Sequence, residues 1–220
     1  MPDTVQPRMP ALLDAEGAAA LVTSYAAVSK GAALKDIGRL DHHMRRFIGL
    51  APICLVATAD ATGRQDVTPR GDPPGAFKVL DERTLAIADR PGNNRLDTLK
   101  NLLANPEIAL IFLIPGINET VRVAGTARLS VDPELLASMA VQDKVPKCAI
   151  VVSVRQAYLH CAKALLRSRL WQGDYAQPKG TFPSISRIVG EQVGLSEAET
   201  QERERINARA EKEGLWAPLS

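Results

Sequence analysis

Residues 89–114, DRPGNNRLDTLKNLLANPEIALIFLI, contain the change of pattern that decides the fold. The stretch passes from a loop rich in Gly and Asn into a segment with leucine at helical spacing. Asn105-Pro106 ends that helix, because proline has no backbone N–H to donate and disfavours the helical conformation of the residue before it. The following EIALIFLI is apolar after its first residue, which predicts a strand buried on both faces.

The residues before this stretch indicate hairpins. Residues 52–58 form a short β-branched run, residues 60–65 have turn composition, and residues 65–70 resume an extended pattern. The runs at 76–81 and 84–89, separated by a short polar turn, predict a second hairpin.

Two further strands are predicted after residue 114. Residues 119–130 alternate polar and apolar side chains around a kink at Gly125, and residues 148–159 form the last strand. Short helices are predicted at 132–143 and 160–171. Strands joined as hairpins and interrupted by short helices predict the α+β class, mainly β, with a six-stranded antiparallel β-barrel and peripheral helices.

The pattern divides the chain into three parts. Residues 1–40 form an N-terminal helical segment, residues 41–175 the barrel, and residues 176–220 a C-terminal helical extension. Within the extension, residues 196–214 are dense in charges of both signs. This composition is typical of a solvated helix or of an arm that embraces a partner subunit.

Composition excludes several classes of function. A net charge of +2 over 220 residues is too close to balance for a protein that must neutralise many phosphates of a nucleic acid. The N-terminus lacks a secretory signal pattern, and no apolar stretch approaches the roughly 18 residues that span a bilayer. The sequence therefore predicts a cytoplasmic protein without nucleic-acid or membrane partners. Three scattered cysteines predict buried free thiols, and three histidines without nearby acidic ligands predict no metal site.

Two irregular loops carry arginine among Gly, Pro and Asn. The first is TPRGDPPG (68–75), which contains Arg70. In the second, DRPGNNR (89–95), the Gly-Asn-Asn run can adopt positive φ and cap a helix that begins near Arg95. The N–H groups of that first helical turn and the Arg95 guanidinium would suit a phosphate, although an ordinary Asn cap and a surface arginine fit equally well. Arg122, in the middle of a strand, projects into a polar or ligand-facing environment.

Four runs together resemble the pyridoxamine 5′-phosphate oxidase-like family of FMN-binding split barrels. They are TPRGDPPG, DRPGNNRLDTLKNLLANPEIALIFLIPG, ETVRVAGTARL and HCAKALLRSRLW, and the resemblance covers residues 40–175. It implies that the barrel is of the split type and that the cofactor is FMN. It also implies a homodimer with FMN at the subunit interface and two equivalent flavin sites.

The resemblance further implies which residues contact the cofactor. The flavin and its ribityl chain would be flanked by Arg70, Ala88, Asp89 and Arg90. The 5′-phosphate would be met, partly through backbone N–H groups, by Asn94, Arg95 and Leu96. Either Thr120 or Arg122 would point toward the flavin ring or the phosphate, and Trp171 would approach the cofactor of the partner subunit.

The chain departs from the family's namesake at its C-terminal end. No histidine follows His160, so the Arg/His motif with which true pyridoxamine phosphate oxidases grip the substrate phosphate is missing. We therefore expect an FMN-dependent oxidoreductase that acts on a different small molecule, with catalytic residues that the sequence does not identify. Two alternatives stay open, because one fold hosts many functions: a non-catalytic flavin-binding protein, and a split barrel that uses a deazaflavin.

Overall fold

The computed structural model describes residues 11–213 and 215. The chain divides into two compact units, residues 1–35 and 36–220. The first contains two helices, α1 (Ala15–Ser24) and α2 (Lys30–Leu34), and neither buries a side chain among the described residues. The Asp14 carboxylate caps α1 by accepting a hydrogen bond from the backbone of Gly17, which satisfies one of the free N–H groups of the first turn.

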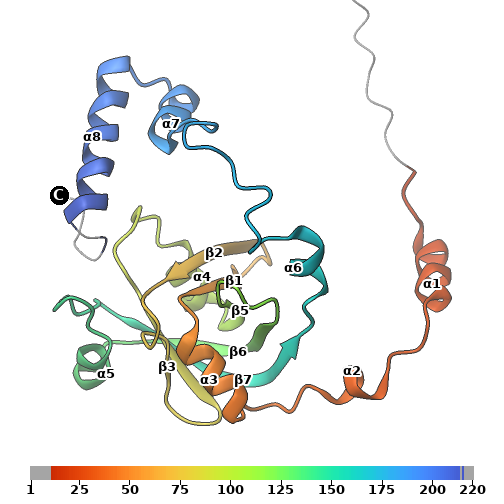
Figure 1. The fold of residues 1–220 in the computed structure, drawn as a ribbon. Coiled ribbons are helices and arrows are strands. Elements are labelled where there is room, and N and C mark those ends of the chain that lie inside the picture. The colour runs from red at the N-terminus through yellow and green to blue at the C-terminus, as the bar shows by residue number, and fades with distance from the viewer. Residues whose placement is uncertain (1–10, 214, 216–220) are drawn as a thin grey trace, which may run out of the picture. The chain divides into compact units, whose positions relative to one another are not determined.

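The second unit is built on one antiparallel sheet of seven strands, in the order β2-β1-β5-β6-β7-β4-β3 (Figure 1). The strands are β1 (Ile53–Ala59), β2 (Gln65–Gly71), β3 (Lys78–Val79), β4 (Thr84–Ala88), β5 (Glu107–Leu113), β6 (Thr120–Ser130) and β7 (Ala149–His160). The predicted class, α+β and mainly β, is confirmed. The strand count is seven rather than six, one for each extended run of the sequence analysis, although the run at 76–81 yields only the two-residue strand β3.

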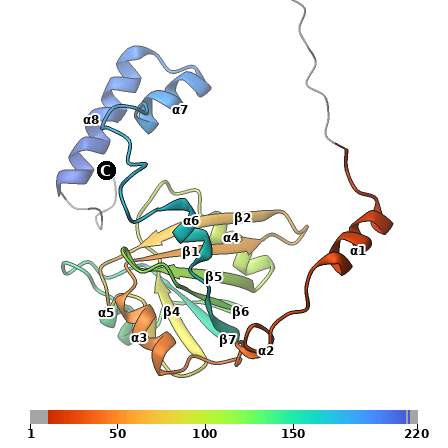
Figure 2. The same ribbon diagram turned by 45° about the vertical axis from the view of Figure 1, so that its right-hand side comes forward.

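In the described residues of the second unit, six helices surround the sheet or follow it, and Figure 2 shows their arrangement. They are α3 (His42–Leu50), α4 (Asp97–Ala104), α5 (Pro133–Ser138), α6 (Lys163–Ser168), α7 (Ile185–Val193) and α8 (Glu197–Glu213). The helix expected at 160–171 is shorter, since His160 still pairs in β7. No helix in the described part of the chain is long and apolar enough to cross a membrane.

The core lies between the inner faces of the strands. Along β1 and β5 the side chains alternate, so that Val56, Leu110 and Phe112 point inward and are fully buried or nearly so. Phe77 packs edge-on against Phe112, with ring centroids 5.4 Å apart, and Ile48 of α3 joins the same cluster. Each fully buried side chain of this size contributes roughly 1.5–3 kcal/mol, so the barrel interior supplies much of the folding free energy.

The outer face of β1 and β5 is also apolar. Leu55 of β1 lies opposite Ile111 of β5, and Leu113 follows on the same face. These outward side chains are only partly buried. The sequence predicts burial of β5 on both faces, whereas the chain by itself fully buries only the inner one, which leaves an apolar strip along β1 and β5.

A β-bulge bends the longest pair of strands. The register between β6 and β7 shifts at Ala124/Gly125, where Arg155 is the additional residue of β7. A Cβ atom at Gly125 would lie 1.9 Å from the backbone oxygen of Ser153. The kink predicted at Gly125 is therefore required by the close approach of the two backbones.

Replacing Gly125 with Ala is expected to destabilise the barrel by about 3 kcal/mol, because the added methyl group overlaps a strand backbone that has no room to move. Urea denaturation gives the free energy of unfolding of the variant. Gly49 provides the matched control, since a Cβ there meets nothing within 4 Å and the residue lies in α3. Gly49→Ala is expected to stabilise the protein slightly, by up to about 1 kcal/mol. Equal effects of the two substitutions would contradict the assignment.

Candidate functional site

Two ion pairs join the ends of strands that are not neighbours in the sheet. Arg70, near the end of β2, donates from Nη1 to the Asp89 carboxylate just beyond β4, at 2.7 Å. Arg90 donates from Nε to both carboxylate oxygens of Asp72, each at 3.0 Å. β2 forms one edge of the sheet and four strands separate it from β4, so these contacts require the sheet to curl until the two strand ends meet. We call Arg70–Asp89 and Asp72–Arg90 the cross-barrel ion pairs.

The Asp72–Arg90 pair is well enclosed. Its side chains are 3% and 11% exposed, and Arg90 makes a third hydrogen bond, from Nη2 to the backbone oxygen of Met139 at the end of α5, at 2.7 Å. The single Nε–H of Arg90 is shared between the two Asp72 oxygens, and the bond from Nη2 to Met139 fixes the guanidinium from a second direction. Removal of one member of such a buried pair costs about 3–5 kcal/mol, because the other charge is left without compensation.

Arg70 has a hydrogen-bond donor to spare. Its Nε atom is buried and has no hydrogen-bond partner among the described residues. A buried donor left unsatisfied costs about 1–3 kcal/mol, so native structures rarely contain one away from a ligand or an ordered water. Arg70 therefore offers a preoriented donor to a group outside the chain.

The loop before α4 has an unusual backbone. Asn94 and Leu96 adopt left-handed conformations, with φ of 58° and 59°. For leucine this conformation carries a strain of roughly 1–2 kcal/mol, and such strain is concentrated at functional sites. Leu96 is also the N-cap of α4 and cannot accept a hydrogen bond from the first turn with its side chain. The first turn of α4 is consequently left without a side-chain cap, which suits an anion.

The expected cap by the Gly-Asn-Asn run is wrong in detail. The helix begins at Asp97 rather than near Arg95, and the Asn93 side chain accepts a hydrogen bond from the backbone N–H of Arg95 instead of from the helix. The Arg95 side chain is largely exposed and donates to the Asp97 carboxylate at 2.6 Å. This bond and the negative charge of Asp97 raise the pKa of Arg95. The positively charged Arg95 side chain therefore lies at the start of α4.

Three other predicted residues lie away from these loops. Thr120 starts β6 and is buried, whereas Arg122 is exposed and lies 5.5 Å from the centre of the Tyr158 ring. The Trp171 indole donates to the backbone oxygen of Ile117, at 2.9 Å, and so ties the segment after α6 to the turn before β6. Of the two alternatives at the start of β6, Arg122 is the side chain that a ligand can reach.

Two of the cysteines lie close to the cross-barrel ion pairs. Burial raises the pKa of the Cys54 thiol, an effect that the nearby Arg70 charge only partly offsets. Partial burial and the negative charge of Asp89 raise the pKa of Cys148. Both thiols therefore stay protonated at neutral pH. The predicted burial holds for Cys54 but not for Cys161, which is exposed.

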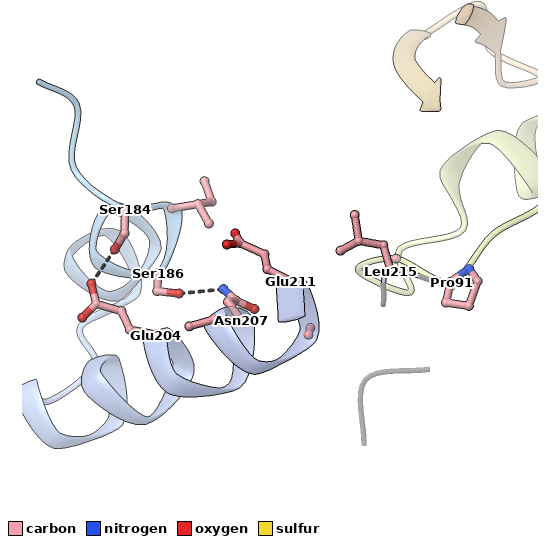
Figure 3. A pocket seen from close by; sticks show the side chains of 11 residues that line it. Pro91, Ser184, Ser186, Glu204, Asn207, Glu211 and Leu215 are labelled. Carbon is pink, nitrogen blue, oxygen red and sulfur yellow. Dashed lines mark hydrogen bonds between the residues drawn. The ribbon is translucent and has the colours of Figure 1, made fainter. Parts of the chain in front are cut away.

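A hollow of about 620 Å³ lies beside the second loop (Figure 3). Pro91, Gly92 and Leu215 line one side of it, and residues at the start of α7 and along α8 line the other. Two hydrogen bonds brace the helical wall, from Ser184 to Glu204 and from Asn207 to Ser186. The C-terminal extension therefore adds a wall next to the loop that carries the predicted site residues.

The structure brings together Arg70, Ala88, Asp89 and Arg90 at the ends of β2 and β4, with Asn94, Arg95 and Leu96 on the loop that follows. Their contacts with FMN stay a prediction. Sequence reasoning missed that Asp72 pairs with Arg90. It also missed the contact from Arg90 to Met139. The first segment, Arg70-Gly71-Asp72, has its cation before its anion, and the second, Asp89-Arg90, has the reverse order. This opposite order is a sequence signal for the pairing of Asp72 with Arg90, but no sequence pattern marks a backbone acceptor such as Met139.

The family model described as pyridoxamine 5′-phosphate oxidase matches residues 40–161. A search of curated proteins finds no match. Among solved structures, HupZ from Group A Streptococcus is 20% identical, with a TM-score of 0.45 over 54% of this chain and 92% of that one. HutZ, the heme storage protein from Vibrio cholerae, is 14% identical, with a TM-score of 0.38 over 56% and 94%.

The structural likenesses assign no function, because the identities are low and the TM-scores lie below 0.5. The family match covers more than half of the chain and includes every strand from β1 to β7. It also includes both loops that carry the cross-barrel ion pairs. This protein therefore belongs to the pyridoxamine 5′-phosphate oxidase family.

Proposed function

We propose that this protein binds FMN and acts as an oxidoreductase on a small organic molecule. The observation that carries the proposal is the buried Nε of Arg70, which has no hydrogen-bond partner among the described residues. The start of α4, which has no side-chain cap, supports it. A donor that needs an acceptor and an anion-binding helix turn are the two features that a phosphorylated, polar cofactor requires. Membership of the pyridoxamine 5′-phosphate oxidase family supports the choice of FMN.

The phosphate is assigned to the loop before α4. Backbone N–H groups near Asn94 and Leu96, in their left-handed conformations, would face the phosphate oxygens, and the Arg95 guanidinium would supply the charge. Arg95 is exposed enough to turn from Asp97 toward a doubly charged ligand. This arrangement also explains why a leucine holds a strained backbone at the helix start.

The flavin end is assigned to the ends of β2 and β4. Arg70 would donate from Nε to a polar atom of the flavin or its ribityl chain, and Asp89 holds the guanidinium in that direction. Ala88, the last residue of β4, is buried in a cluster with Leu136, Met139 and Ala149, which fixes the strand end that would face the flavin. When bound, the isoalloxazine supplies the electron-transfer chemistry, while the protein supplies orientation and electrostatics.

Absorption spectroscopy of the purified protein, with mass spectrometry of any released cofactor, tests the cofactor. We expect an oxidised-flavin spectrum and FMN, followed by bleaching when a nicotinamide or another donor reduces the flavin. Released deazaflavin would replace FMN in the proposal. Bound FMN that no donor reduces would instead assign a non-catalytic flavin-binding role.

The phosphate assignment predicts a preference between two ligands. We expect the protein to bind FMN at least about tenfold more tightly than riboflavin, since the two differ only in the phosphate. Arg95→Gln should remove most of that preference by weakening FMN and leaving riboflavin binding unchanged. Arg64→Gln is the matched control, because Arg64 is also exposed and also pairs with a nearby aspartate, Asp60. Quenching of flavin fluorescence measures both constants, and an unaltered ratio in Arg95→Gln would place the phosphate elsewhere.

We further propose that the protein is a homodimer whose subunits meet through the apolar strip of β1 and β5. Leu55, Ile111 and Leu113 remain partly exposed on that strip, and a second copy is the partner that would give β5 its second buried face. Arg122 and Trp171 would then reach the cofactor of the other subunit, since they lie away from the loops of their own. The FMN would be shared across the interface.

Ile111→Lys is expected to convert the dimer into a monomer, because it places an unpaired charge in the centre of an apolar interface. Light scattering after size-exclusion chromatography measures the mass in solution. Val131→Lys serves as the control, since Val131 is 73% exposed and lies between β6 and α5. A dimer that survives Ile111→Lys would show that the interface lies on another surface.

A further inference from the structure

The cross-barrel ion pairs form a closed ring with the chain itself. Arg70 and Asp72 are joined through Gly71, and their partners Asp89 and Arg90 are joined by one peptide bond. The charges run in opposite order on the two segments, so each segment contributes one cation and one anion. A displacement of either pair is therefore transmitted to the other through at most one intervening residue.

The two pairs differ in what they leave free. Arg90 is engaged at Nε by Asp72 and at Nη2 by the backbone oxygen of Met139, so it links three segments of the chain. Arg70 is engaged by Asp89 through Nη1, while its buried Nε has no hydrogen-bond partner among the described residues. No buried donor of Arg90 lacks a partner among the described residues, whereas Arg70 presents its Nε.

We propose that Asp72 is a positioning residue for the ligand donor Arg70. Asp72 fixes Arg90, and thereby holds the neighbouring Asp89 against Arg70, so that Nε of Arg70 keeps its direction. Asp72 does not contact the ligand in this arrangement. The inference rests on the proposed FMN site for the identity of the ligand, but the ring of contacts on which it depends is present in the protein without a ligand.

A double-mutant cycle separates positioning from general support of the fold. Asp72→Asn removes the charge that holds Arg90 and should weaken FMN binding about tenfold, through Arg70. In an Arg70→Gln background the same change should alter FMN affinity by less than about twofold, because the residue through which Asp72 acts is already lost. Glu82→Gln, which breaks the exposed pair with Arg39, is the control and should leave FMN affinity unchanged in both backgrounds.

Two outcomes of the cycle would overturn the proposal. One is an Asp72→Asn variant that binds FMN as well as the parent, and the other is a loss that multiplies with that of Arg70→Gln, which indicates independent effects. If Asp72→Asn does not fold, Asp72→Glu retains the charge and displaces it by one methylene group. That variant should weaken FMN binding, and its effect should likewise disappear in the Arg70→Gln background.

Hydrogen exchange on the protein without added flavin tests the same ring if the parent proves not to bind FMN. The Asp89 backbone N–H is bonded to the Cys148 oxygen at 2.9 Å, so its protection reports the position of the segment after β4. Asp72→Asn should accelerate exchange at residues 88–90, and Glu82→Gln should not. If the parent does not bind FMN, only the assignment of FMN as cofactor is contradicted. If exchange in Asp72→Asn is unchanged, the positioning role of Asp72 is contradicted.

Discussion

The closure of the barrel by Arg70–Asp89 and Asp72–Arg90 is the constraint on which the rest of the site depends. Hydrogen bonds between adjacent strands run from β2 to β3 along the sheet, but they do not join β2 to β4. The cross-barrel ion pairs make that connection with side chains. Because two charges of each sign meet in a partly enclosed space, the contacts compensate one another and tolerate burial that an isolated charge would not.

The same closure explains where irregular backbone is concentrated. The segment after β4 leaves the sheet at Asp89, passes the hollow at Pro91 and enters α4 through the left-handed Leu96. Its start is held by the ion pairs and its end by the buried first turns of α4, where the Asn101 amide donates to Thr58 of β1 at 3.0 Å. A loop fixed at both ends can maintain a strained conformation between them, as binding loops on rigid scaffolds do.

The outer surface of the second unit has an apolar part and a charged part. The strip along β1 and β5 is apolar and faces away from the core, whereas Arg122 and Tyr158 on β6 and β7 present a cation beside an aromatic ring. The helices α7 and α8 pack closely, since Gly190 leaves no space for a side chain against Thr200. These helices therefore form a firm wall for the hollow beside Pro91 and Gly92.

The sequence by itself determined the class of the fold and which residues form most of the strands. Alternation along residues 119–130, the proline after Asn105 and the kink at Gly125 are local signals, because they depend on neighbouring residues and on backbone sterics. The loops around Arg70 and Arg95 were also identified as a candidate site, from their Gly, Pro and Asn content and from the resemblance to a family.

Only the tertiary structure decided which charges meet. Asp72 is two residues from Arg70 in sequence, yet it pairs with Arg90, and Arg70 pairs with Asp89 at the end of a strand from which four other strands separate it in the sheet. The left-handed conformation of Leu96 and the burial of Thr120 were likewise not local properties. The physical reason is that pairing across a barrel depends on how the whole sheet curls, and this depends on the packing of side chains far apart in the chain.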